Sequence, residues 1–185
     1  MADKPRILTN GKDMVWTLIP LLAVCAFVAI ASGNCSVGLS GQAAEDRRPA
    51  FELTPALRAD VASMPFPIRI PPTPSGWKPN SGSRDGVGAG LASMVGWVTA
   101  SGAYLQLTQT NATEEELVAH LGGDDLASGS GTRAIDGRTW VTYHTYRDQK
   151  FWITDFGDAR VAVLSIGPDE DLATMATLVQ RAPAQ

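Results

Sequence analysis

The sequence is poor in cysteine, with only Cys25 and Cys35 in 185 residues. If one helix carried both, their separation of ten positions would place them roughly 15 Å apart along its axis, too far for a disulfide. We therefore expect no internal disulfide. The residues after Cys35 hold no cysteine at all, so that part of the chain must be stabilised by its own apolar core.

Motifs for catalysis, metals and cofactors are also missing. The two histidines, His120 and His144, have no partner at the spacing of a metal site. The Asp-Phe-Gly at 155–157 matches a kinase tripeptide, but no glycine-rich phosphate loop, strand lysine or catalytic loop accompanies it. The glycines at 86–90 lack dinucleotide spacing. We predict no catalysis, no metal and no cofactor.

Positive charge is scarce in most of the chain. Residues 45–185 contain 12 Lys and Arg against 17 Asp and Glu, a net charge of −5. Such a surface repels nucleic-acid phosphates and anionic lipid headgroups. Nucleic acid is therefore excluded as a main partner.

Residues 14–32 contain no charged side chain over 19 positions. At about 1.5 Å rise per residue, a helix of this length spans close to the ~30 Å hydrocarbon core of a bilayer. A charge at that depth would cost a few kcal/mol, and none is present. The pattern predicts one transmembrane helix over 14–32, with the lipid bilayer as its partner.

Flanking charge predicts the orientation of this helix. Lys4, Arg6 and Lys12 precede the apolar segment, and the first positive residue after it is Arg47. The positive-inside rule then places residues 1–13 in the cytoplasm and the rest of the chain outside the cell membrane.

Two other interpretations of the apolar segment stay open. The Ala-Ile-Ala-Ser at 29–32 resembles a signal-peptide cleavage site, although the apolar run exceeds the usual ~7–15 residues. Acylation of Cys35 as in a lipoprotein would favour Gly or Ala before it, where the chain has Asn34. The sequence leaves undecided whether the segment is cleaved and whether Cys35 is modified.

The remaining residues divide into a flexible tether over 33–50, rich in small and polar residues, and a folded domain over 51–185. Apolar spacing predicts three helices in the domain, and Thr113 with Glu116 forms a capping box for the second. Alternating strands are expected at 91–99, 104–110, 132–135, 138–145, 150–156 and 160–166.

Two weaker expectations concern the start of the domain. Ile68 and Ile70 lie in a proline-rich segment and are assigned to an edge strand, and residues 81–90 are assigned to a loop. The predicted fold class is α+β: an antiparallel sheet of five to six strands with helices packed on one face, preceded by the transmembrane helix.

Aromatic residues concentrate on these strands. If helices cover only one face, some of the aromatic side chains lie exposed on the other, where they would suit a partner or ligand. Alternatively, Trp97 and Trp140 belong to the core. The candidate binding surface consists of Trp77, Trp97, Tyr146 and Trp152.

Several segments together resemble a known family. They are D-M-V-W at 13–16, F-P-I-R-I-P-P-T-P-S-G-W at 66–77, Y-L-Q-L-T-Q-T at 104–110 with the acidic helix after it, and W-I-T-D-F-G at 152–157. The chain resembles the domain of unknown function 4245 family of actinobacterial single-span membrane proteins over nearly its whole length. That resemblance implies a membrane protein and no established activity.

Two functional hypotheses follow. The first is a membrane-tethered extracytoplasmic module that binds an envelope protein or a small ligand without catalysis. The second is an envelope hydrolase in which His144 acts as general base beside a carboxylate, Asp155 or Asp136.

Overall fold

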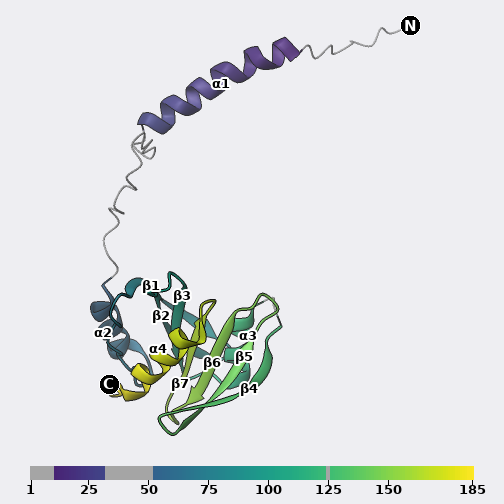
Figure 1. Cartoon of the computed structure of the whole chain (residues 1–185). Helices are drawn as coiled ribbons and strands as arrows, with labels where there is room; N and C mark the ends of the chain where they lie inside the picture. The colour runs from purple at the N-terminus through teal and green to yellow at the C-terminus, as the bar shows by residue number, and fades with distance from the viewer. Residues whose placement is uncertain (1–10, 32–51, 124–125) are drawn as a thin grey trace. The chain divides into compact units, whose positions relative to one another are not determined.

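The computed structural model describes residues 11–31, 52–123 and 126–185, and the chain divides into two units, 1–48 and 49–185 (Figure 1). The predicted tether over 33–50 and Cys35 lie outside the described residues.

The first unit contains helix α1, Gly11–Ala31, of 21 residues. This helix includes all of the predicted membrane span except its last residue, at position 32. Among the helices that the structure describes, none is both long and apolar enough to cross a membrane. The transmembrane helix at 14–32 stays a prediction.

The second unit is built on one antiparallel sheet of seven strands in the order β1-β2-β3-β7-β6-β5-β4. Its strands are β1 (Lys78–Val87), β2 (Gly90–Val98), β3 (Tyr104–Thr110), β4 (Ser128–Ile135), β5 (Arg138–His144), β6 (Lys150–Asp155) and β7 (Arg160–Ser165). Pairing of β3 with β7 joins two meanders. The α+β class with an antiparallel sheet is confirmed, but the predicted count of five to six strands is wrong.

Strand β1 is the element that the sequence did not predict. Residues 81–90 were assigned to a loop because they are polar and rich in glycine, whereas Lys78–Val87 pairs with β2 along its length. The strand lies at the edge of the sheet and is largely exposed, so it needs no apolar alternation.

The expected edge strand at Ile68 and Ile70 is also wrong. The only sheet-like pairing there is one bridge between Arg69 and Ala184. Prolines lack the N–H that a ladder needs. The segment is bound instead by the buried amide of Gln109, which accepts from the Arg69 N–H and donates to the Arg69 carbonyl, each at 2.8 Å.

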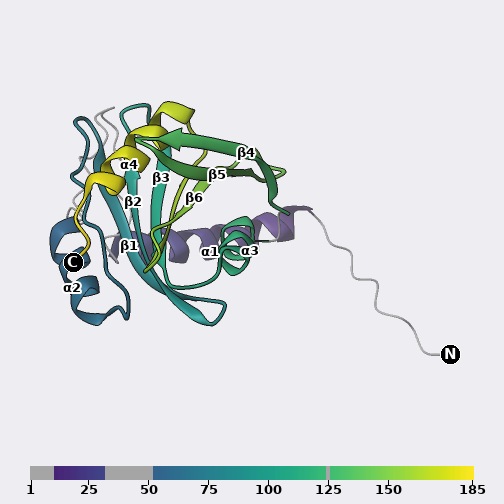
Figure 2. The ribbon, with the colours of Figure 1, turned by 90° about the horizontal axis from the view of Figure 1, so that it is seen from below.

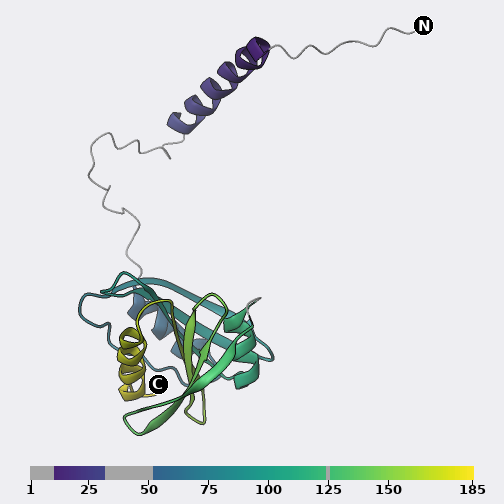
Figure 3. The ribbon, with the colours of Figure 1, turned by 45° about the vertical axis from the view of Figure 1, so that its right-hand side comes forward.

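Helices cover both faces of the sheet. Helices α2 (Leu53–Ser63) and α4 (Asp169–Arg181) pack in one core, and α3 (Glu114–Gly122) packs in a second core on the other face. Figure 2 and Figure 3 show α3 and α4 on opposite sides of the strands. The prediction that helices pack on one face is therefore wrong.

Strand β7 shows why both faces need cover. Val161 and Val163 lie in the core beneath α4, whereas Ala162 and Leu164 lie in the core beneath α3. All four are buried. A strand that is apolar on both faces would expose half of its apolar area if one layer of helices were absent.

Helix α3 begins as the sequence predicted. The Thr113 hydroxyl accepts from the Glu116 N–H at 3.2 Å, and the Glu116 carboxylate accepts from the Thr113 N–H at 2.8 Å, which completes the capping box. The other Glu116 oxygen accepts from the Ala89 N–H at 2.9 Å. The helix is thus fixed to the β1–β2 turn.

Helix α2 is held to the sheet by a buried carboxylate. Asp60 accepts a hydrogen bond from the Ser93 hydroxyl at 2.5 Å and forms an ion pair with Arg84. The carboxylate is 5% exposed, and Ser93 is buried beside it. A buried charge is tolerated only with such partners.

We expect Asp60→Ala to lower the free energy of unfolding by about 2 kcal/mol, because the buried Ser93 hydroxyl loses its acceptor and Arg84 its counter-ion. Urea unfolding measures this change. Arg181→Ala is the control: it removes the exposed ion pair between Arg181 and Asp136, and the expected loss is below about 0.5 kcal/mol. Equal losses in both variants would contradict the role of Asp60.

Candidate functional site

The four aromatic residues predicted to form a binding surface do not form one. Trp77, Trp97 and Trp152 are 9%, 0% and 2% exposed, and all three belong to the core beneath α2 and α4. Tyr146, in the β5–β6 turn, is 92% exposed. The expectation fails because helices cover both faces, so no open face remains for the tryptophans.

The alternative position of Trp97 and Trp140 in the core is confirmed. Both are fully buried. The Trp97 indole donates to the Thr73 hydroxyl at 3.2 Å, and that of Trp140 donates to the Gln180 amide oxygen at 3.3 Å. Each buried N–H is thus satisfied.

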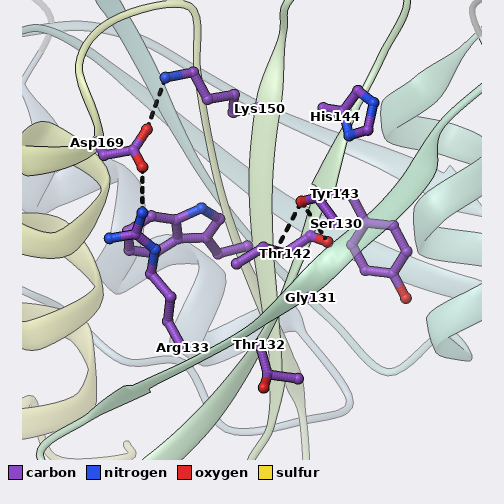
Figure 4. A pocket seen from close by; sticks show the side chains of 10 residues that line it. Ser130, Gly131, Thr132, Arg133, Thr142, Tyr143, His144, Lys150 and Asp169 are labelled. Carbon is purple, nitrogen blue, oxygen red and sulfur yellow. Dashed lines mark hydrogen bonds and ion pairs between the residues drawn. The ribbon is translucent and has the colours of Figure 1, made fainter.

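An open pocket of about 460 Å³ lies where the edge of the sheet meets the start of α4 (Figure 4). Three consecutive strands and one helix contribute to it. Its polar lining includes Ser130, Thr132 and Arg133 of β4, His144 of β5, Lys150 of β6 and Asp169 of α4. No sequence motif marks these residues, because the pairing of the strands and the packing of α4 against the sheet bring them together.

Irregular pairing of β4 shapes the rim of the pocket. The register between β4 and β5 shifts between Gly129 and Gly131, and Gly131 has a φ of 131°, which favours glycine. The intervening Ser130 turns its hydroxyl to Thr142, 3.1 Å from the carbonyl and 3.0 Å from the side-chain oxygen. This hydroxyl is therefore already engaged.

Charge in the pocket centres on Asp169. One carboxylate oxygen lies 2.5 Å from the Arg133 guanidinium and the other 2.7 Å from the Lys150 ammonium. The hydrogen bond from Lys150, with the charges of Lys150 and Arg133, holds the pKa of Asp169 below its ordinary value against the opposing effect of burial. The guanidinium also lies over the Trp152 ring, 4.8 Å from its centroid.

Tyr143 lines the pocket but directs its ring elsewhere, as Figure 4 shows. The ring stacks on Phe151 at 5.2 Å between centroids, and the hydroxyl donates to the Glu114 carboxylate at 2.7 Å. Burial, reinforced by this hydrogen bond and the negative charge of Glu114, raises the pKa of Tyr143 to about 12. Tyr143 therefore fastens α3 to β5.

His144 shares the pocket with a carboxylate, but not with the ones expected. Asp155 pairs with Arg160 at 2.8 Å and Asp136 with Arg181 at 2.6 Å. Both lie at the opposite end of the strands from His144, since Asp155 ends β6 and Asp136 precedes β5. Among the described residues, no hydrogen bond joins the His144 imidazole to Ser130 or to Asp169.

A second cavity, of about 330 Å³, lies on the face that α3 covers. His120 lines it, as do Tyr104 and Gln106, which belong to a row of hydrogen-bonded side chains that ends at Thr108. In the part of the chain that the structure describes, no group of three or more His, Cys, Asp and Glu side chains is arranged to hold a metal. The pocket beside α4 is the candidate site because it combines a concave surface with charged side chains from separate elements.

Glu114→Gln should lower the pKa of Tyr143 from about 12, because the carboxylate charge disfavours the phenolate. The fold favours the neutral phenol, so its contribution to stability is complete below the ordinary pKa of about 10 and is lost as the pH rises through about 12. Tyrosinate absorbance during alkaline titration checks this. Glu115→Gln is the control, and an equal shift in both variants would contradict the assignment.

Comparison with known proteins identifies a family that matches most of the chain. The family described as "Protein of unknown function (DUF4245)" matches residues 6–179, which include α1 and nearly all of the domain. No curated protein and no solved structure matches the chain. Because the match extends over far more than half of the 185 residues, the chain belongs to the DUF4245 family.

Proposed function

We propose that the chain is a membrane-tethered extracytoplasmic binding module that holds an envelope ligand or partner without catalysis. The pocket between β4, β5, β6 and α4 is its binding site. The observation that carries this proposal is the meeting of Arg133, Lys150 and Asp169 around an open pocket of about 460 Å³. Convergent polar groups over a largely buried aromatic ring are typical of ligand sites.

The rigidity of the surroundings supports a binding role. The floor of the pocket includes Trp152, which is 2% exposed and packed in the core. Hydrogen bonds between β4 and β5 and between β5 and β6 hold the strands that line the pocket in place. A preformed site binds with less loss of conformational entropy than one that must order first.

The proposed attachment to the cell membrane is supported by the 19 uncharged residues at 14–32 and by the lysines and arginine before them. The N-terminus is then cytoplasmic, and the domain lies outside. Residues 33–50 provide the tether.

We expect the full chain to stay with the membrane during an alkaline carbonate wash. Leu22→Asp should release it, because a carboxylate near the centre of a spanning helix costs about 2.5–3.5 kcal/mol. Leu22→Ala, which adds no charge, is the matched control and should stay. Release of the unaltered full chain would contradict the tether.

Blocking the pocket should abolish ligand binding. His144 lies exposed at the end of β5, on the strand face that lines the pocket, so His144→Trp should fill the pocket without disturbing the core. Purified full chain is incubated with a small-molecule extract of cell envelopes, and retained compounds are identified by mass spectrometry. The control, Ser83→Trp, introduces the same side chain at an exposed position on β1, and should retain the same compounds as the unaltered chain.

Two outcomes would contradict this proposal. One is equal retention by His144→Trp and Ser83→Trp. The other is chemical conversion of the retained compound that disappears in His144→Ala, which would favour the alternative, a hydrolase. That alternative has one observation in its favour: His144, Ser130 and Asp169 line the same pocket.

Several contacts weigh against the hydrolase. The Ser130 hydroxyl is directed at Thr142, and both oxygens of Asp169 are held by cations. A general base needs a hydrogen-bonded path to the proton that it removes. Binding therefore explains the pocket better than hydrolysis does.

A further inference from the structure

The pocket beside α4 is dominated by hydrogen-bond donors. Arg133 and Lys150 carry positive charge, and Thr132 and the ring nitrogens of His144 add donor capacity. Asp169 is the only acidic residue in the lining. The charged groups of the lining therefore sum to +1, in a chain whose net charge is −4.

The single carboxylate is shared between two cations. Its oxygens lie 2.5 Å from Arg133 and 2.7 Å from Lys150. A guanidinium has five N–H donors in a planar fork and binds oxyanions through two of them at once. One carboxylate cannot accept from every N–H donor of Arg133 and Lys150, so some of these donors remain available to a ligand in the pocket.

Arg133 is held where a ligand can reach it. Its side chain is 51% exposed, and its guanidinium lies over the buried Trp152 ring at 4.8 Å. Lys150 is 38% exposed on the neighbouring side of Asp169. Figure 4 shows the two cations on either side of the Asp169 carboxylate. The carboxylate thus occupies a position between two cations that an external oxyanion would also favour.

We infer that the pocket binds the carboxylate or phosphate group of a small ligand, and that Asp169 is an internal competitor that the ligand displaces from Arg133 and Lys150. This inference rests on the proposed binding function and names its ligand class. The domain as a whole is acidic and repels anions, whereas the charged groups that line this pocket sum to +1 and attract an oxyanion.

Removal of the competitor provides the main test. Isothermal titration of the full chain in detergent uses sodium phosphate and sodium acetate at constant ionic strength and neutral pH. Asp169→Asn should bind at least one of these anions about tenfold more tightly than the unaltered chain, because the anion no longer displaces a charged carboxylate from Arg133 and Lys150.

The matched control for charge is Glu170→Gln. Glu170 lies next to Asp169 in the first turn of α4 but does not line the pocket. The Glu170→Gln variant should bind anions with the same affinity as the unaltered chain. An equal gain in Glu170→Gln and Asp169→Asn would overturn the inference, because general charge would then explain the effect.

Removal of the cations provides the second test. Arg133→Gln and Lys150→Gln, each made in the Asp169→Asn background, should weaken anion binding about tenfold or more. Arg181→Gln in the same background is the control, since Arg181 pairs with Asp136 at the far end of the strands. Near-ultraviolet circular dichroism verifies folding, and the exposure of both cations makes loss of the fold unexpected.

The two anions distinguish the sources of the ligand group. Tighter binding of phosphate indicates a phosphorylated ligand, and tighter binding of acetate indicates a carboxylate. Failure of Asp169→Asn to bind either anion at millimolar concentration overturns the inference. If His144→Trp still loses the envelope compound in that case, the binding module stands without an oxyanion. If the retention of compounds by His144→Trp is unchanged as well, the proposed function also fails.

Discussion

The domain depends on a sheet that must be covered on both faces. Its central strands, β3 and β7, carry buried residues on alternate sides, so neither side can face water without exposing apolar surface. Helices α2 and α4 cover one side, and α3 covers the other. This arrangement explains why the tryptophans are inside and why the charged pocket lies where the edge of the sheet meets a helix end, rather than on a sheet face.

Covering both faces also places polar groups in buried positions, and two of these groups join separate elements. Asp60 binds Ser93 and Arg84 between α2 and the sheet. Gln109 uses both ends of its amide to bind the backbone of Arg69. The Gln109 contacts substitute for the regular ladder that the proline-rich segment cannot make. Layers of the domain are therefore joined by a few directional bonds within an otherwise apolar core.

Local patterns in the sequence predicted much of this fold. The strand predicted at 150–156 implies that neighbours such as Phe151 and Trp152 lie on opposite faces, and the structure places them in the two different cores. A repeat of two residues along a strand shows which side chains share a face, but it does not show whether a helix covers that face. The prediction that helices cover only one face of the sheet was wrong for this reason. The exposure predicted for Trp77, Trp97 and Trp152 depended on it and was wrong as well. Strand β1 was missed because an exposed edge imposes no apolar pattern. The pocket escaped prediction because Arg133 and Lys150 meet Asp169 only through the packing of α4 against the sheet.

The two edges of the sheet share a further property. Strands β1 and β4 are composed mainly of small, polar and exposed residues, and each breaks register with its neighbour, between Pro79 and Ser81 and between Gly129 and Gly131. An incoming strand would meet interrupted pairing and little apolar area to bury at either edge. Both edges therefore disfavour edge-to-edge pairing between copies of the domain, and at β4 the same irregularity also shapes the pocket.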